Sequence, residues 1–482
     1  MRRGLALNIV SNLVFFISSY CIHYYLGSTV PAASYGVVGT IITVLDFEYM
    51  FVSNGARQSL SAHISSRNFD IADLIRKTIA FQCLIVVFFF LVNFIGSPVF
   101  ADIFHDDSLQ FYFKLAAFLI PANGFYVVVL GINDGLQRFG HSAFLSTIYP
   151  IFKLGVIPLI IFLFPHDPVS GVELGYLLAM VATIIIGLIL LIPLRHRFSQ
   201  GGNERIHFSV VAQQTLSFSF FFIMVSIVLS LDTLVVKAVV EPDSMAGYYT
   251  GAMNFGKTSY YLLQAFAVVI LPIVSRLVSA NKRREALGAA QELVLIAFAF
   301  VLPLAMIISS TSGSLLATFY HPSYDIAAPA LTFLAPSSFF MGMTVVLNMV
   351  INIRRSNHFS DILSIVSLII VIPMFIVSAR FGGITYLALS SMVCTCIAMI
   401  ISYLKARRSF GNMFTSTTWK VIAINCGIWI VLFAVTHLVT IRSLPELAVL
   451  YAAVYAGYLI CMVKFGVVKP SSLLAAMHSK QS

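Results

Sequence analysis

Two lysines, Lys153 and Lys257, lie several residues inside long apolar stretches of the sequence. A charged side chain at the centre of a bilayer costs at least about 2.5 kcal/mol, so such groups usually face a wet cavity or a partner. An ammonium group in a wet cavity would attract an anionic group of a substrate. Both lysines are therefore candidate substrate-binding residues, and a lysine that reaches the interface or pairs with an acid is the alternative.

Two acidic residues, Asp46 and Glu48, lie at about the middle of another apolar stretch. On an α-helix, residues two apart point roughly 200° from each other, so both cannot face one cavity squarely. One of them could bind a proton or Na⁺ and couple transport to an ion gradient, while the other pairs with a lysine of a neighbouring helix. A structural ion pair is the alternative interpretation.

Three arginines and an aspartate near the ends of apolar stretches complete the set of candidates. Arg57 and Arg276 could engage the phosphate groups of a substrate at the mouth of a cavity, or simply anchor their helices in the membrane. Asp134 and Arg138 are four residues apart, which is the spacing of a pair within one helix. We therefore expect them to form a structural or gating ion pair.

Two kinds of motif that would indicate a metal site or ATP chemistry are missing from the sequence. The six cysteines all lie in apolar runs and form neither a zinc-binding pattern nor a disulfide framework, so no metal site is expected. The sequence contains no Gly-x-x-x-x-Gly-Lys-[Ser/Thr] loop, so ATP chemistry is not expected either. We predict a protein that is not an enzyme and holds no cofactor, apart from the coupling proton or sodium ion.

The composition indicates a membrane protein. Of the 482 residues, 59% are hydrophobic and 10% are charged, and the mean hydropathy is +0.94. A soluble domain carries about 25% charged residues, so this supply cannot cover a surface that faces water. In a soluble protein, the net charge of +10 would suggest that the protein binds nucleic acid. Here the basic residues punctuate apolar runs and indicate membrane topology instead.

Apolar stretches long enough to cross a bilayer recur along the whole chain, and each crossing needs about 20 residues. We predict an all-α polytopic membrane protein, with helices over residues 5–26, 33–58, 76–100, 111–136, 142–164, 172–194, 208–237, 244–275, 288–310, 325–353, 360–379, 383–404, 419–440 and 446–465. No connection between these segments is long enough for a catalytic domain, which disfavours a membrane glycan polymerase.

The basic residues predict the orientation of the chain in the membrane. Most of the 29 Lys and Arg residues fall at one set of helix ends, which are then the cytoplasmic ends. Both termini are therefore expected in the cytoplasm, with the chain crossing a cell membrane many times. No cleavage site follows Met1-Arg2-Arg3 at the right place, so we expect the first helix to be retained.

Two echoes in the sequence predict an internal repeat. Pro121 and Pro336 occupy corresponding places near the start of the fourth and tenth helices, and basic residues end both helices. At nearly the same offset, Tyr35-Gly36 enters the second helix and Gly247-Tyr248 the eighth. The repeat predicts two six-helix bundles, at 1–200 and 205–410, and two additional helices with a short cytoplasmic tail at 415–482. An even number of helices in each copy gives a pseudo-two-fold axis along the membrane normal, so transport by rocking about a central cavity is expected.

The number of helices, the repeat and several local sequences resemble one branch of a known superfamily. These sequences are Tyr35-Gly36 and Gly247-Tyr248 at the entries to the second and eighth helices, Pro272, and Asn54-Gly55-Ala56-Arg57. Together they look like the polysaccharide transporter, O-antigen flippase-like branch of the multidrug/oligosaccharidyl-lipid/polysaccharide (MOP) exporter superfamily. The resemblance covers about residues 1–410, and it reaches the last two helices by their number only.

The resemblance implies a flippase that moves a polyprenyl-diphosphate-linked oligosaccharide from the cytoplasmic to the outer leaflet. The purpose would be assembly of a cell-surface polysaccharide, such as O-antigen, capsule or exopolysaccharide. The implied partners are membrane lipids and a glycan polymerase or glycosyltransferases, with no nucleic acid. A peptidoglycan lipid-precursor flippase, which would show a cluster of arginines in its early helices, and a multidrug/cation antiporter, which would have twelve helices, are the alternatives.

Overall fold

The computed structural model describes residues 2–66, 70–194, 206–264, 274, 277–278, 282–352, 359–438, 441, 443–464 and 466. The regular elements within these ranges are helices, and no strand occurs among them.

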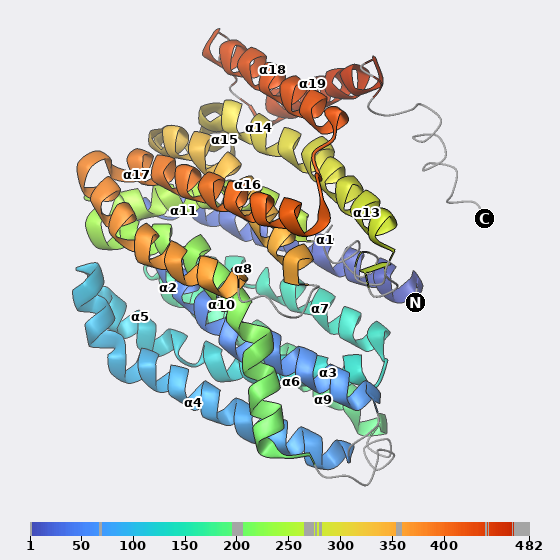
Figure 1. Cartoon of the computed structure of the whole chain (residues 1–482). Helices are drawn as coiled ribbons and strands as arrows, with labels where there is room; N and C mark the ends of the chain where they lie inside the picture. The colour runs from blue at the N-terminus through green and yellow to red at the C-terminus, as the bar shows by residue number, and fades with distance from the viewer. Residues whose placement is uncertain are drawn as a thin grey trace. The chain divides into compact units, whose positions relative to one another are not determined.

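The helices of the first half of the chain follow one another with short connections. In order, they are α1 (Arg2–Thr29), α2 (Ala32–Tyr49), the π-helix η1 (Met50–Asn54), α3 (Gly55–Ser66), α4 (Ile71–Phe104), α5 (Ser108–Ala116), α6 (Leu119–Gly135), α7 (Phe139–Lys153), α8 (Val156–Phe162), α9 (Pro168–Leu191), α10 (Phe208–Val239) and α11 (Ser244–Gly256). Figure 1 shows their arrangement.

The second half is built in the same way, with more interrupted helices. In order, they are α13 (Arg283–Ile296), the π-helix η3 (Ala297–Val301), α14 (Leu302–Ser310), α15 (Ser312–Phe319), the 3₁₀-helix η4 (Pro322–Ala327), α16 (Ala328–Asn352), α17 (Phe359–Phe410), α18 (Ser416–Leu438) and α19 (Leu444–Lys464).

The described residues contain ten helices that are long and apolar enough to cross a membrane. One of them, α17, has 52 residues and non-helical backbone at Gly382 and Gly383, so it supplies two of the predicted crossings. Each predicted helical range falls mainly on helix where it is described, with turns inside three of them, at residues 117–118, 154–155 and 257; four ranges, among them 244–275, are described only in part. The predicted all-α, multi-pass membrane architecture is therefore confirmed.

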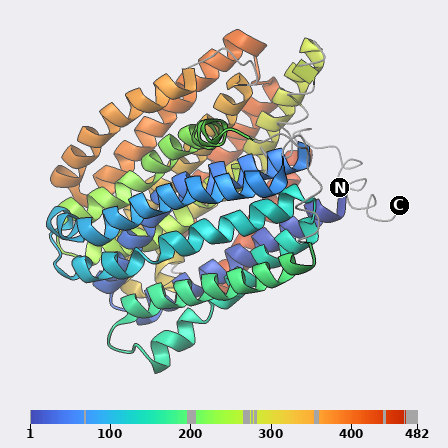
Figure 2. The same ribbon diagram turned by 90° about the horizontal axis from the view of Figure 1, so that it is seen from below.

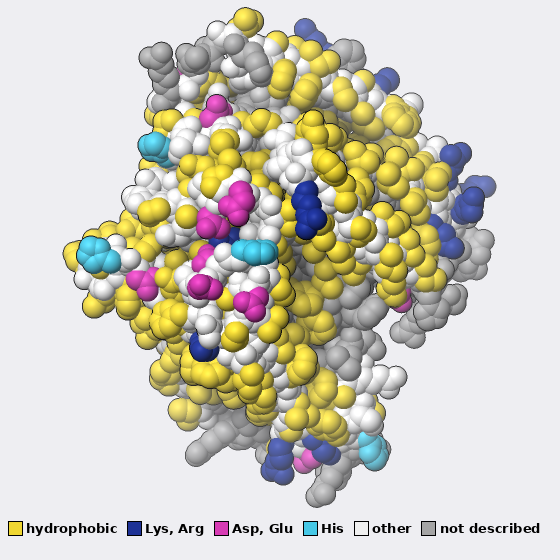
Figure 3. Space-filling view, turned by 90° about the vertical axis from the view of Figure 1, so that its left-hand side faces the viewer, with side chains coloured by type: hydrophobic (Ala, Val, Ile, Leu, Met, Phe, Trp, Pro, Cys, Tyr) yellow, Lys and Arg dark blue, Asp and Glu magenta, His cyan; other side chains and the backbone are white. Residues whose placement is uncertain are grey.

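Many large hydrophobic side chains are exposed on the surface of the molecule, among them Leu84, Phe162, Ile189, Phe381 and Ile430. Figure 3 shows one face, where hydrophobic side chains cover most of the surface and acidic side chains gather near its middle. Apolar surface of this extent is unfavourable in water but matches the hydrocarbon of a bilayer.

By packing, the chain divides into two compact units, residues 1–247 and 248–482. In the first unit, α1 packs on α7, and α6 packs on both α3 and α9; Figure 2 shows the blue and teal helices of this unit alongside one another, with the green helix α10 seen end-on. Helix α10 packs against α2, α3 and α4, so it belongs to the first unit by its contacts. The boundary predicted at residues 200–205 separates two copies of a sequence repeat, whereas these two units are defined by packing. The repeat and its boundary therefore stay a prediction.

Two glycines let α6 approach α3 closely. A Cβ atom on Gly135 would lie 2.6 Å from Cβ of Ile64, and one on Gly131 would lie 3.3 Å from Cα of Arg57. Small residues at a helix contact allow backbones to come together in a membrane, where van der Waals packing drives association. The close approach brings Arg57 of α3 beside the last turns of α6.

The second unit has its own apolar core. Helix α16 packs against α14 and α17, and α18 packs against α14 and α19. Buried side chains from these helices, such as Phe298, Phe339, Val421 and Tyr458, meet in one cluster. The last two helices are therefore integrated in the second unit.

Candidate functional site

Lys153 lies in a cage of aromatic rings within the first unit. It is the last residue of α7, where the helix stops before α8 begins at Val156. Its Nζ atom lies 3.8 Å from the ring centroid of Tyr176 and 5.8 Å from the centroids of both Tyr149 and Phe15. Each ring face attracts a cation, and the attraction is larger where water is partly excluded. The side chain is half-buried, so its ammonium group is held but is not sealed off.

No ion pair within 4.0 Å of Lys153 occurs among the described residues. Its carboxylate neighbour at longer range is Asp46 of α2, with which it interacts electrostatically. The three donors of the ammonium group therefore remain available to an anionic ligand. The structure thus brings together two of the predicted site residues, Lys153 and Asp46.

Asp46 and Glu48 point in opposite directions, as the helical spacing predicted. Asp46 is exposed, whereas Glu48 is buried against α4 with 2% of its surface accessible. The side-chain amide of Asn93 donates a hydrogen bond to Glu48 Oε1, while Glu48 Oε2 has no hydrogen-bond partner. A buried carboxyl group with one unpaired oxygen is costly to keep in an apolar surrounding. Glu48 is therefore an acid buried for a reason other than packing alone.

Arg57 pairs with Asp134 across the contact between α3 and α6. Its Nε atom donates to Asp134 Oδ2 at 2.8 Å, and its Nη2 atom donates to Ser142 Oγ at 3.3 Å. The predicted pair within one helix, Asp134 with Arg138, requires a helix that continues to residue 138. Instead, α6 ends at Gly135, and Gln137 has a φ of 58°, so the chain turns away and Asp134 meets Arg57.

Tyrosines connect the arginine with the lysine cage. The ring of Tyr126 in α6 lies 5.4 Å from that of Tyr149 in α7, and Tyr126 interacts electrostatically with Arg57. Tyr149 in turn contacts the ammonium group of Lys153. Two cations and the aromatic rings between them therefore form a row along the first unit. Such a row can offer charge to an anion and flat faces to a sugar ring.

The other two predicted cations belong to the second unit. Lys257 is half-buried and lies in the turn that follows α11, where its backbone N–H still bonds to Met253. No ion pair of Lys257 occurs among the described residues. Arg276 lies outside the described residues.

The comparisons with known proteins agree with this architecture. The profile of the polysaccharide biosynthesis protein family matches residues 1–278. The chain belongs to this family. None of the curated proteins matches the sequence significantly.

Solved structures of several exporters share the fold of this family member. A lipid II flippase, MurJ, in an inward closed conformation has a TM-score of 0.72 and 15% identity, with 96% of this chain and 99% of that chain covered. An inward-facing multidrug resistance MATE transporter of the MOP superfamily has a TM-score of 0.66 and 12% identity, with 84% of this chain and 95% of that chain covered. A mutant of the Vibrio cholerae MATE transporter VcmN has a TM-score of 0.53 and 14% identity, with 84% of this chain and 94% of that chain covered. At these identities the likeness concerns the fold.

This protein also has a buried acidic residue that was not predicted as a site residue from the sequence. Glu173 near the start of α9 has 4% of its surface accessible, and neither carboxylate oxygen has a hydrogen-bond partner. Its sequence position, two residues into a predicted crossing, is the signal that was available. The aromatic partners of Lys153 were missed too, because Phe15 and Tyr176 are distant from it in sequence.

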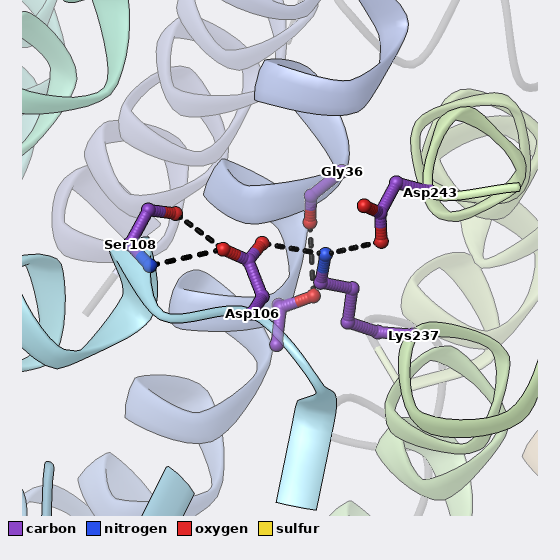
Figure 4. Close-up of polar contacts among 6 residues, drawn as sticks. Gly36, Asp106, Ser108, Lys237 and Asp243 are labelled. Carbon is purple, nitrogen blue, oxygen red and sulfur yellow. Dashed lines mark hydrogen bonds and ion pairs between the residues drawn. The ribbon is translucent and has the colours of Figure 1, made fainter. Parts of the chain in front are cut away.

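A buried lysine in the first unit joins three segments of the chain through ion pairs (Figure 4). Lys237 near the end of α10 donates to Asp106, between α4 and α5, at 2.7 Å and to Asp243, before α11, at 2.8 Å. Ser108 donates to the other oxygen of Asp106. Burial alone raises the pKa of Asp106, but hydrogen bonds from Lys237 and Ser108 outweigh it and hold the pKa below its ordinary value. The cluster therefore ties α10 to the connection between α4 and α5.

Among the described residues, no group of three or more His, Cys, Asp or Glu side chains could hold a metal ion. The cysteines in the same residues are free.

Proposed function

We propose that this protein is a flippase that moves a polyprenyl-diphosphate-linked oligosaccharide from the cytoplasmic to the outer leaflet of a cell membrane. The family supports a role in polysaccharide biosynthesis, and the fold is that of known exporters, among them a lipid II flippase. In this proposal the oligosaccharide and diphosphate cross through the protein by alternating access, while the polyprenyl tail stays in lipid.

The observation that carries the proposal is the aromatic cage of Lys153. A diphosphate that leaves water needs a compensating charge, and a half-buried ammonium group with free donors supplies it. Of the rings around this ammonium group, Phe15 is exposed and Tyr149 is half-buried, and an aromatic face beside a cation suits the apolar side of a sugar. Anion and sugar are joined in one lipid-linked substrate, so a site that combines both features fits it.

We place both termini in the cytoplasm, because the basic residues then lie on the cytoplasmic side. Glycosyltransferases that complete the lipid-linked oligosaccharide would act before this protein. A glycan polymerase on the outer side would act after it. For coupling we propose Asp46 or Glu48 as the site of a proton or sodium ion, with Glu48 favoured by its burial and its unpaired oxygen.

Deletion of the gene in its host tests the proposal. The lipid-linked oligosaccharide should accumulate on the cytoplasmic side, the surface glycan should disappear, and expression of this chain should restore it. Normal surface glycan in the deletion strain, with no related exporter present, would overturn the proposal. Accumulation of single, unpolymerised repeat units on the outer side would point to polymerisation instead.

A further inference from the structure

The helical segment from α13 to α15 in the second unit, which precedes η4, is interrupted twice. It contains the π-helical stretch η3, and α14 stops at Ser310 before α15 begins at Ser312. Thr311 between them has φ −112° and ψ 18°, so the helix bends there, although its own N–H and C=O keep their bonds to Ile307 and Leu315. A break inside a membrane protein frees polar backbone groups, which must find partners in protein or line a polar space.

Side chains of the two last helices supply partners to these freed groups. Tyr458 of α19 donates to the carbonyl oxygen of Ala299 in η3 at 2.6 Å. Thr436 of α18 donates to the carbonyl oxygen of Ser310 at 3.0 Å, and the hydroxyl of Tyr451 in α19 lies 2.7 Å from that of Thr311. Helices α18 and α19 therefore hold the broken helix from one side.

A pocket of about 660 Å³ opens beside the break, and all of its lining residues belong to the second unit. The hydroxyl groups of Ser312, Ser314, Thr332 and Thr436 line part of it, and those of Ser312, Thr332 and Thr436 also bond within the protein. The exposed carboxylate of Asp325 also lines the pocket and lies close to the first turn of α15. These groups both donate and accept hydrogen bonds within one space.

Two aromatic rings form the apolar part of the pocket wall. Phe333 comes from α16 and Phe433 from α18. Phe433 is stacked on Trp429, with ring centroids 4.9 Å apart and planes 15° apart. The Nε1 atom of Trp429 donates to Ser309 Oγ at 3.0 Å, which fixes the stacked pair against the broken helix. An aromatic face next to several hydroxyl groups is thus built into the pocket.

We propose that this pocket binds a saccharide. The hydroxyl groups of a sugar can form hydrogen bonds with the hydroxyl and carboxylate groups of the pocket, and the apolar face of the sugar can stack on an aromatic ring. A single metal cation would leave most of the volume unused, and one carboxylate is a poor cation cage. An acyl chain would leave the carboxylate of Asp325 facing hydrocarbon without a polar partner. The choice of saccharide rests on the proposed function, in whose topology the connection between α15 and α16 faces the outer side, where the glycan is released.

Tryptophan fluorescence tests the proposal in the purified full-length protein in lipid nanodiscs. The chain has two tryptophans, so Trp419→Phe leaves Trp429 as the reporter beside the pocket. The probes are maltohexaose, which is neutral, and trigalacturonate, which is acidic. We expect a saturable change in emission with at least one probe at concentrations up to about 10 mM, a weak affinity typical of single sugar sites. Asp325→Ala and Phe333→Ala should each weaken it roughly tenfold, and Ile189→Ala, at an exposed position of the first unit, should leave it unchanged.

Saturation-transfer NMR on the same sugars repeats the measurement without depending on Trp429. If Asp325→Ala does not fold, Asp325→Asn and Ser314→Ala serve in its place. Absence of binding by both methods would overturn the proposal, as would sugar binding that these variants do not alter, or an emission change caused by NaCl alone. Because binding is measured without transport, loss of sugar binding and loss of flippase activity are separate outcomes.

Discussion

The Nε atom of Arg57 in α3 lies 2.8 Å from a carboxylate oxygen of Asp134 in α6. The two residues meet because Gly131 and Gly135 allow the helices to approach closely. The side chain of Arg57 keeps 39% of its surface accessible, against 16% for Asp134. The arginine can therefore hold the helices together and still present its charge to a ligand.

Exchange of the two charges separates these roles. Arg57→Asp and Asp134→Arg should each destabilise the protein by about 1 to 2 kcal/mol, between the values of exposed and buried pairs. The double variant should recover thermal stability in detergent, because the pair is rebuilt in reverse. Export of surface glycan should stay low, because the cation has moved from α3 to α6. Full export by the double variant would show that Arg57 has a structural role only.

The cluster around Lys237 predicts an unequal effect of its two acids. The side chain of Lys237 has 1% of its surface accessible, that of Asp106 has 16%, and that of Asp243 has 59%. Asp106→Asn should cost about 2 to 3 kcal/mol of stability, because it leaves a buried ammonium group with one exposed partner. Asp243→Asn should cost less than about 1 kcal/mol. Equal shifts in the melting temperature of the two variants would contradict this ranking.

Acid should weaken the same cluster in a defined direction. The pKa of Asp106 is lowered in the folded protein from its ordinary value of 3.8. Its contribution to stability is therefore fully present above about pH 4 and is lost as the pH falls through the folded-state pKa. The difference in melting temperature between wild type and Asp106→Asn should be constant from pH 7 to about pH 5 and should shrink below about pH 4. A difference that grows in acid would be inconsistent with the lowered pKa.

Glu48 offers a test of ion coupling. Glu48→Gln keeps an acceptor for the Asn93 amide and removes the ionisable group, so the protein should remain folded. If Glu48 carries the coupling proton, transport by this variant should no longer respond to an imposed pH gradient, as measured in reconstituted vesicles. Asp46→Asn is the matched comparison on the opposite side of α2. An unchanged response to both proton and sodium gradients in the two variants would remove both residues as coupling sites.

The parts of this structure that depend on apolar length and helical period were predictable from the sequence. Long apolar segments fixed where the helices lie, and the 100° step per residue predicted that Asp46 and Glu48 point apart. Pairings between distant segments were not predictable. Asp134 was expected to pair with Arg138, because nothing in the spacing reveals that α6 ends at Gly135.

The surroundings of the candidate site illustrate the same limit. Lys153 was recognised as a cation within an apolar segment, but its aromatic cage combines α1, α7 and α9, and only the packing of these helices brings the rings together. The role of α18 and α19 was likewise hidden, because it depends on hydrogen bonds to breaks in another helix. Contacts of this kind are properties of the three-dimensional arrangement rather than of any local sequence pattern.

Flipping by the purified protein in lipid vesicles tests the central claim most directly. The probe is the polyprenyl-diphosphate-linked oligosaccharide isolated from a host that lacks this chain, and its exposure is followed with an impermeant glycosidase. The protein should bring the inner-leaflet pool to the outside faster than empty vesicles do, and Lys153→Ala and Lys257→Ala should each slow it roughly tenfold, the loss of one charged hydrogen bond. The exposed Lys420→Ala should flip at the normal rate. A rate equal to that of empty vesicles, or normal flipping when both lysines are replaced, would contradict the account.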